Sequence, residues 1–91
     1  MSEERFYLYD ETEKTETRFV SFMGKKERFD LAITKTERFY GKSLVFDMQG
    51  SRFSIIGIDD LETPGYLEKA FQLNEEQADE LRDFLSEVIH V

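Results

Sequence analysis

The chain has 91 residues, and its 40% hydrophobic content with nine Phe and four Tyr is sufficient for the packed core of one domain, 1–91. It has no cysteine and one histidine, which excludes disulfides, thiol chemistry and cysteine- or histidine-rich metal sites within one chain. The net charge of −8 is uneven: residues 1–58 are balanced, whereas residues 59–91 hold ten acids against Lys69 and Arg82. No signal-peptide or membrane-spanning run occurs, so we expect a cytoplasmic, acidic protein with flexible residues 1–4 and no membrane partner.

Residues 5–58 are predicted to be rich in β-strands. Four stretches of β-branched and aromatic residues predict strands at 15–23, 28–36, 42–49 and 52–58. The connections between them are too short for parallel crossovers, so the strands are expected to form an antiparallel meander. The segment RFYLY at 5–9 is a candidate fifth strand.

Alternation along the strands predicts which residues share a face of the sheet. The predicted apolar face contains Phe29, Leu31 and Ile33 from one strand and Leu44, Phe46 and Met48 from the next. The stretches 15–23 and 52–58 have apolar residues on both faces. This pattern predicts strands that are central or covered on both sides.

Residues 59–91 are predicted to be helical and acidic. A turn-rich connection follows Ile58, and residues 66–71 are expected to form a short helical turn. Asn74 is a favourable N-cap with Gln77 three residues later, which predicts the start of an amphipathic helix over 75–89. The predicted apolar arc contains Ala78, Leu81, Phe84, Leu85, Val88 and Ile89. The expected fold class is therefore α+β, a meander of four to five strands with this C-terminal helix packed on one face.

Five of the six arginines are followed by phenylalanine, at 5–6, 18–19, 28–29, 38–39 and 52–53. Adjacent residues of a strand point to opposite faces, so each ring and its guanidinium cannot share one surface. A nucleic-acid platform needs rings and cations on the same exposed face, which makes nucleic-acid binding the less favoured hypothesis. Nucleic-acid binding stays open as an alternative function of residues 1–58, whose charges balance, with Arg18 and Phe22 as the residues to test.

The predicted C-terminal helix has an acidic face. Its six carboxylates are Glu75, Glu76, Asp79, Glu80, Asp83 and Glu87. Like charges at i,i+4 cost about 0.2–0.5 kcal/mol per pair, and Arg82 is the only basic residue within the helix. Such a face is predicted to bind a basic protein partner, while the alternative is that it serves solubility.

The sequence gives only weak signals for a ligand-binding, metal or catalytic site. Asp59, Asp60 and Tyr66 form an alternative cluster for a small ligand or metal ion, but the spacing of a calcium loop is missing, so Asp60 is expected to cap or turn the chain. His90 is expected to be a solvated cation beyond the helix. No nucleophile–base pair or phosphate-binding loop occurs, so no enzyme activity, catalytic residue, metal or cofactor is predicted.

Six segments carry a resemblance that spans nearly the whole chain: RFYLYD, TRFVSFMG, RFDLAI, GKSLVFDMQ, FSIIGIDDLE and GYLEKAF. Together they resemble a family of short, uncharacterised cytosolic proteins from Gram-positive bacteria. The resemblance implies a small α+β domain of unknown function and supplies no site residues. Homodimerisation through a sheet edge or face is compatible with each of these functions.

Overall fold

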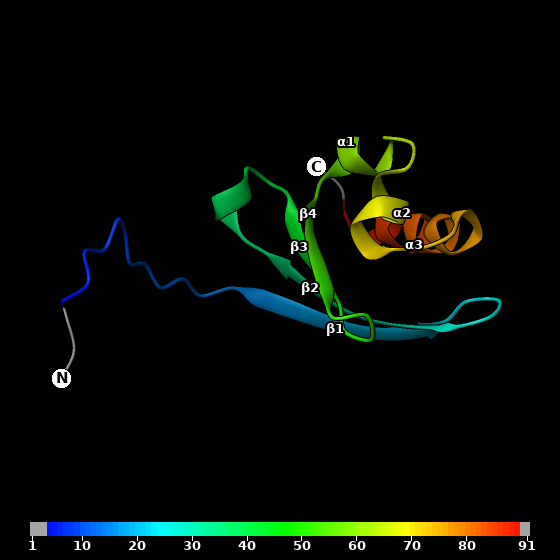
Figure 1. Ribbon diagram of the computed structural model, residues 1–91, viewed down its shortest axis with the longest axis horizontal. Coiled ribbons are helices and arrows are strands. Elements are labelled where there is room, and N and C mark those ends of the chain that lie inside the picture. The colour runs from blue at the N-terminus through cyan, green and yellow to red at the C-terminus, as the bar shows by residue number, and fades with distance from the viewer. Residues whose placement is uncertain (1–3, 90–91) are drawn as a thin grey trace.

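The computed structural model describes residues 4–89, and within them four strands precede three α-helices (Figure 1). The predictions for residues 1–3 and His90 lie outside the described residues. The elements are β1 (Glu16–Met23), β2 (Arg28–Lys35), the 3₁₀ helix η1 (Glu37–Phe39), β3 (Ser43–Asp47), β4 (Arg52–Ile56), α1 (Ile58–Leu61), α2 (Tyr66–Phe71) and α3 (Glu75–Val88).

The strands form one antiparallel sheet in the order β1-β2-β3-β4, which confirms the predicted meander. Short turns join the neighbours; in the first, the Gly24 N–H donates to the Glu27 carbonyl at 2.7 Å. The register places Phe22 opposite Phe29 and Ile33 opposite Val45. Side chains that are directly opposite in this way lie on the same face of the sheet.

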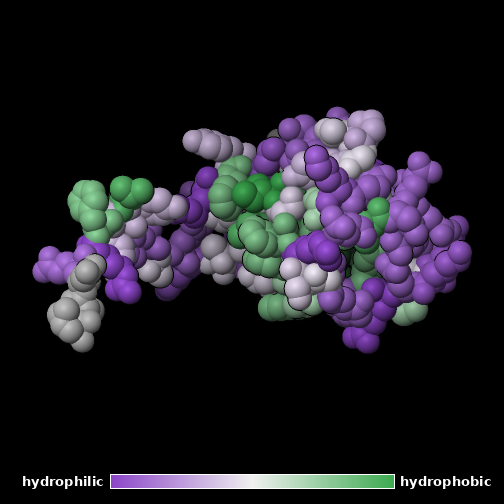
Figure 2. Space-filling model, viewed as in Figure 1, coloured by the Kyte–Doolittle hydropathy of each residue, from purple (hydrophilic) through white to green (hydrophobic). Residues whose placement is uncertain are grey.

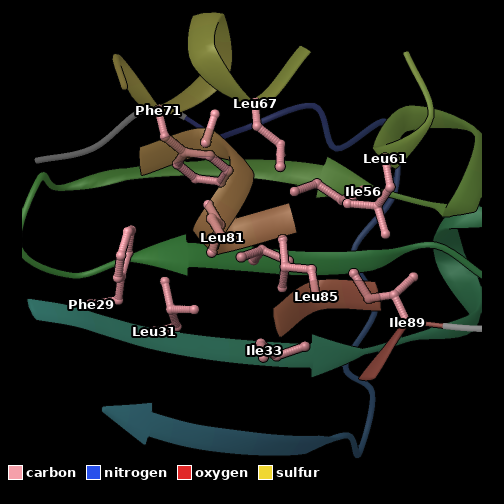
Figure 3. Packing of buried hydrophobic residues seen from close by; sticks show 12 residues of the cluster. Phe29, Leu31, Ile33, Ile56, Leu61, Leu67, Phe71, Leu81, Leu85 and Ile89 are labelled. Carbon is pink, nitrogen blue, oxygen red and sulfur yellow. The ribbon is translucent and has the colours of Figure 1, made fainter. Parts of the chain in front are cut away.

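The helices cover one face of the sheet and bury the core against it (Figure 3). The buried cluster contains Phe29, Leu31, Ile33, Val45, Ile56, Leu61, Leu67, Phe71, Ala78, Leu81, Leu85 and Ile89. The start of α3 is fixed locally, because the Gln77 N–H donates to Asn74 Oδ1 at 2.8 Å while the Asn74 N–H donates to Gln77 Oε1 at 2.9 Å. The predicted α+β class and the packing of the C-terminal helix on the sheet are confirmed.

The candidate fifth strand at 5–9 does not form, which decides for four of the expected four to five strands. Residues 4–15, the N-terminal arm, form neither helix nor strand and extend away from the sheet in Figure 1. Arg38 explains their course, since its guanidinium lies 5.1 Å from the Tyr9 ring centroid and 2.7 Å from Glu11 Oε1. These contacts hold the arm at the connection between β2 and β3 rather than along a strand edge, so residues 5–9 lack the neighbouring strand that ladder hydrogen bonds require.

The predicted facing of β3 is also wrong. Val45 is fully buried and Ser43 is nearly so, whereas Leu44 and Phe46 are only partly buried. Val45 lies opposite Ile33 in the register, and it therefore points toward the helices while Leu44 and Phe46 point to the other side. Both rows of β3 contain apolar residues, so alternation alone did not show which row the helices cover.

Two further expectations are corrected. The stretches with apolar residues on both faces are neither central nor covered on both sides within residues 4–89, because β1 and β4 are the edge strands and their Phe19 and Phe53 are exposed. The turn-rich connection contains α1, which begins at Ile58, a residue that the strand pattern had included in 52–58. The Gly57 N–H donates to Asp60 Oδ2 at 2.9 Å, and this local bond starts the helix directly after β4.

Candidate functional surfaces

The six predicted carboxylates of α3, the helix stripe, all lie on the solvent side of that helix. The stripe consists of Glu75, Glu76, Asp79, Glu80, Asp83 and Glu87. It has this position because the opposite arc of α3, with Ala78, Leu81 and Leu85, is buried against the sheet. All members are exposed except Glu80, which is half-buried.

The turn between β1 and β2 contacts the first half of the helix stripe. The Lys25 N–H donates to Glu80 Oε2 at 2.6 Å, and Lys26 Nζ lies 4.0 Å from Glu76 Oε1. Gly24 permits the close approach, because a Cβ atom there would lie 2.6 Å from Glu80 Oε1. Arg82 is the only cation within the helix, as the sequence indicated, and further groups that bind the stripe come from a turn about 50 residues earlier.

Arg82 joins α3 to the two short helices. Its guanidinium donates to the Leu61 carbonyl at 3.0 Å and to Asp79 Oδ1 at 2.6 Å, and it lies 3.5 Å from Glu68 Oε1. Arg82 thus binds groups of α1 and α2 as well as Asp79 of its own helix. Among residues 4–89, no hydrogen bond or ion pair involves the side chains of Glu75, Asp83 or Glu87.

The alternative ligand cluster of Asp59, Asp60 and Tyr66 does not come together as one site. Asp60 Oδ2 accepts from the Gly57 N–H and, at 3.0 Å, from Lys42 Nζ, so the predicted capping role of Asp60 is confirmed. Asp59 lies 3.6 Å from the same Lys42 amine. The hydrogen bond from Lys42 to Asp60 raises the pKa of Lys42, with the charges of Asp60 and Asp59 adding to it and partial desolvation opposing it.

Tyr66 forms its hydrogen bonds with β4 and not with the two aspartates. Its hydroxyl lies 2.9 Å from Ser54 Oγ and donates to the Ile55 carbonyl at 3.0 Å, which ties α2 to β4. No described hydrogen bond joins Tyr66 to Asp59 or Asp60. In the described part of the chain, moreover, no group of three or more His, Asp or Glu side chains is placed to hold a metal ion.

The face of the sheet opposite the helices, the open face, was not predicted as a site. One cross-strand row runs over all four strands and consists of Phe19, Ala32, Phe46 and Phe53. Phe19 is 71% exposed and Phe53 62% exposed, and the Phe53 ring centroid lies 5.9 Å from that of Phe46. Figure 2 shows hydrophobic surface over the middle of the molecule, where Figure 1 places the strands, beside a largely hydrophilic helical end. The signal in the sequence was the apolar character of both faces of the two edge strands.

The charges on the open face neutralise each other. Arg28 Nε lies 3.0 Å from Asp30 Oδ1 and also donates to Ser21 Oγ at 3.1 Å. Gln49 donates to the second oxygen of Asp30 at 2.7 Å. The Ser21 hydroxyl, which faces Asp30 across the strand pair, and the Arg28 guanidinium lower the pKa of Asp30, with Gln49 adding to the effect and desolvation opposing it.

Replacing Ser21 by Ala is expected to raise the pKa of Asp30 toward its ordinary value of 3.8, as followed by carbon NMR of the carboxyl group across acidic pH. Because the pKa is lowered in the folded state, Asp30 contributes stability above its ordinary pKa of 3.8, and this is lost as pH falls through the folded value. Thr17→Ala is the control, since the Thr17 hydroxyl also lies on β1 but bonds to Thr34. An Asp30 titration that is the same in Ser21→Ala and in the unmodified protein would contradict this assignment.

Two hollows lie beside the N-terminal half of β1. The larger, of about 1090 Å³, lies between the N-terminal arm and the β2–β3 connection and includes Arg38, Lys42 and Ile89 in its lining. Its cations Arg38 and Lys42 bind the chain's own carboxylates, as described above. The smaller, of about 630 Å³, lies between β1, β2 and the end of α3.

The two residues of the nucleic-acid alternative both point toward the helices. The Arg18 guanidinium lies 5.9 Å from the Phe84 ring centroid. The Phe22 ring lies between Phe29, at 5.1 Å, and Phe84, at 4.9 Å. Phe22 is half-buried by these contacts while Arg18 stays exposed, and Phe19, the neighbour of Arg18, lies on the open face instead.

Comparison with protein families gives one match. Residues 8–87 match the family described as SAV0927-like. The chain belongs to the SAV0927-like family. This is a small family of uncharacterised proteins, as the resemblance had predicted, and the SAV0927-like match includes the whole sheet and nearly all of α3. No match was found among curated proteins. Within residues 4–89 of this SAV0927-like chain, no helix has both the length and the apolar character needed to cross a bilayer.

Proposed function

We propose that the protein is a cytoplasmic, non-enzymatic protein-interaction module that binds a basic partner through the helix stripe. The observation that carries the proposal is the exposure of Glu75, Asp83 and Glu87, which form no ion pair within 4.0 Å among residues 4–89. These three carboxylates lie along one side of a regular helix. With a rise of about 1.5 Å per residue, the stripe extends over about 18 Å from Glu75 to Glu87, which matches a short basic helix or strand of a partner.

The internal contacts of the stripe favour binding over simple solubility. Lys25 and Arg82 hold Glu80 and Asp79 in defined positions, and the buried arc fixes the rotation of α3. The exposed carboxylates therefore lie on a rigid helix. Binding of a partner then orders little of the module that is not ordered already, so the entropy cost on the module's side is small. Exposed charges act over a Debye length of about 8 Å at physiological ionic strength, so the association is expected to weaken steeply with salt.

The test compares two double variants of equal charge in pull-downs from cytosol with and without nuclease treatment, followed by titration of each protein that is retained. Asp83→Lys with Glu87→Lys reverses two stripe carboxylates that have no described intramolecular partner. Glu37→Lys with Glu62→Lys makes the same change in net charge at exposed sites outside α3. We expect the stripe variant to lose affinity by about tenfold or more while the control retains it.

Equal loss in both variants would mean that only net charge matters, and retention in both, together with indifference to salt, would overturn the proposal. A partner that is captured only without nuclease would instead favour the nucleic-acid alternative. A thermal shift with magnesium, manganese or nucleotides would favour a small-ligand function, since selective binding to the native state raises its stability.

A further inference from the structure

The open face combines features that are unusual for a solvent-exposed sheet. Antiparallel sheets with one solvated face commonly carry polar residues there. Here the rings of Phe19, Phe46 and Phe53 follow one another across the strands, with Ala32 buried beneath them. Leu44 and Ile55 are opposite each other in the next apolar pair. Contiguous apolar surface of this kind marks an interaction site.

The charge distribution decides which partner fits. The strand residues on the open face include one acid and one base, Asp30 and Arg28, which pair with each other. The net charge of −8 is carried by residues 59–91, and the described part of this range forms the helix layer on the other side. Two copies of the chain repel each other strongly if their helix layers meet, whereas their open faces meet without opposing like charges. A basic partner is attracted to the helix layer and gains nothing electrostatically from the open face.

The size of the open face is near the lower limit for association. Four strands about 4.8 Å apart and about five residues long, at about 3.4 Å per residue, define a surface of roughly 15 by 17 Å before side chains are added. Two such surfaces cover about 500 Å², and the eight-residue strands β1 and β2 and the projecting phenylalanine rings enlarge the buried area toward the roughly 1,000 Å² that a specific interface needs. Sheets pack face to face about 10 Å apart with interleaved side chains, a spacing that accommodates the phenylalanine rings.

We propose that a second copy of this chain covers the open face, so that two sheets pack against each other in a two-fold symmetric dimer. The same patch is used by both copies, as such symmetry requires. The phenylalanine row becomes the centre of the interface, and the two acidic helix layers form its outer sides. Each helix stripe stays accessible, so the dimer is independent of the proposed binding of a basic partner.

The proposal is tested by sedimentation velocity and light scattering on the full chain over a wide range of concentrations. The expected result is a concentration-dependent increase from 10.8 kDa to twice that mass. Phe53→Glu and Phe19→Glu each place like charges in the interface and are expected to weaken dimerisation by about 30-fold or more. Both residues are mostly exposed, so circular dichroism is expected to show an unchanged fold; Phe53→Ser is a milder variant that keeps the test valid if a charge disturbs folding.

The matched control is Phe6→Glu, which makes the same change at a 91% exposed phenylalanine of the N-terminal arm and is expected to leave the dimer intact. Salt distinguishes the two proposals, because an apolar interface is retained at high ionic strength while binding of a basic partner is lost. A monomeric mass at every concentration would overturn the dimer and leave the open face to another protein. A dimer that depends on Phe6 but not on Phe19 or Phe53 would overturn it in favour of exchange of the arm.

Discussion

Replacing Val45 by Asp is expected to lower the free energy of unfolding by at least about 3–5 kcal/mol at neutral pH. Val45 is fully buried in β3 and belongs to the core cluster that the helices cover. An unpaired carboxylate at this position loses its hydration and finds no cation, which costs about 3–5 kcal/mol or more. The total stability of a chain of this length is only about 5–14 kcal/mol, so the folded population falls sharply.

The measurement is urea denaturation followed by circular dichroism at low protein concentration. Phe46→Asp is the matched control, since it makes the same kind of change at the next residue, which points to the open face and is only partly buried. The control is expected to lose less stability than Val45→Asp. The reverse order would show that the helices cover the row of Leu44 and Phe46, as alternation in the sequence had predicted.

Replacing Phe71 by Ala is expected to lower the free energy of unfolding by about 3–5 kcal/mol. Phe71 ends α2 and is 2% exposed within the core cluster between the helices and the sheet. Truncation removes the buried ring and leaves a cavity that close-packed neighbours fill only partly. The loss is measured by urea denaturation from the shift of the midpoint at constant slope.

Phe6→Ala is the control for this truncation. The side chain of Phe6 is 91% exposed on the N-terminal arm, so its removal is expected to change stability by no more than about 0.5 kcal/mol. A similar loss in both variants would contradict the assignment of Phe71 to the core. A loss of less than about 1 kcal/mol for Phe71→Ala would show that α2 is not an essential part of the helix layer.

The two proposed surfaces lie on opposite sides of the molecule and depend on different physical forces. The helix stripe consists of charged groups on a helix whose buried arc packs against the sheet. The centre of the open face is a row of apolar groups, on the side of the sheet that no element within residues 4–89 covers. This separation lets one protein associate with itself and with a basic partner at the same time, and it makes the two interactions separable by salt and by single substitutions.

The sequence by itself determined the elements whose cause is local. Asn74 and Gln77 are three residues apart, and their reciprocal hydrogen bonds start α3 where the pattern predicted it. The short connections between the strands exclude parallel crossovers, so the meander also followed from spacing. The same reasoning placed Phe29, Leu31 and Ile33 on the buried side of β2, where polar residues on the other side made the alternation unambiguous.

Only the tertiary structure decided the features that depend on residues far apart in the chain. Glu80 is bound by Lys25, 55 residues earlier, and the arm follows Arg38, 27 residues after Glu11. The open face follows from the register of four strands, because Phe19 and Phe53 become parts of one row only when the residues between them pair. Periodicity describes the two faces of each strand separately, whereas the choice of the face that helices cover depends on the packing of the whole chain.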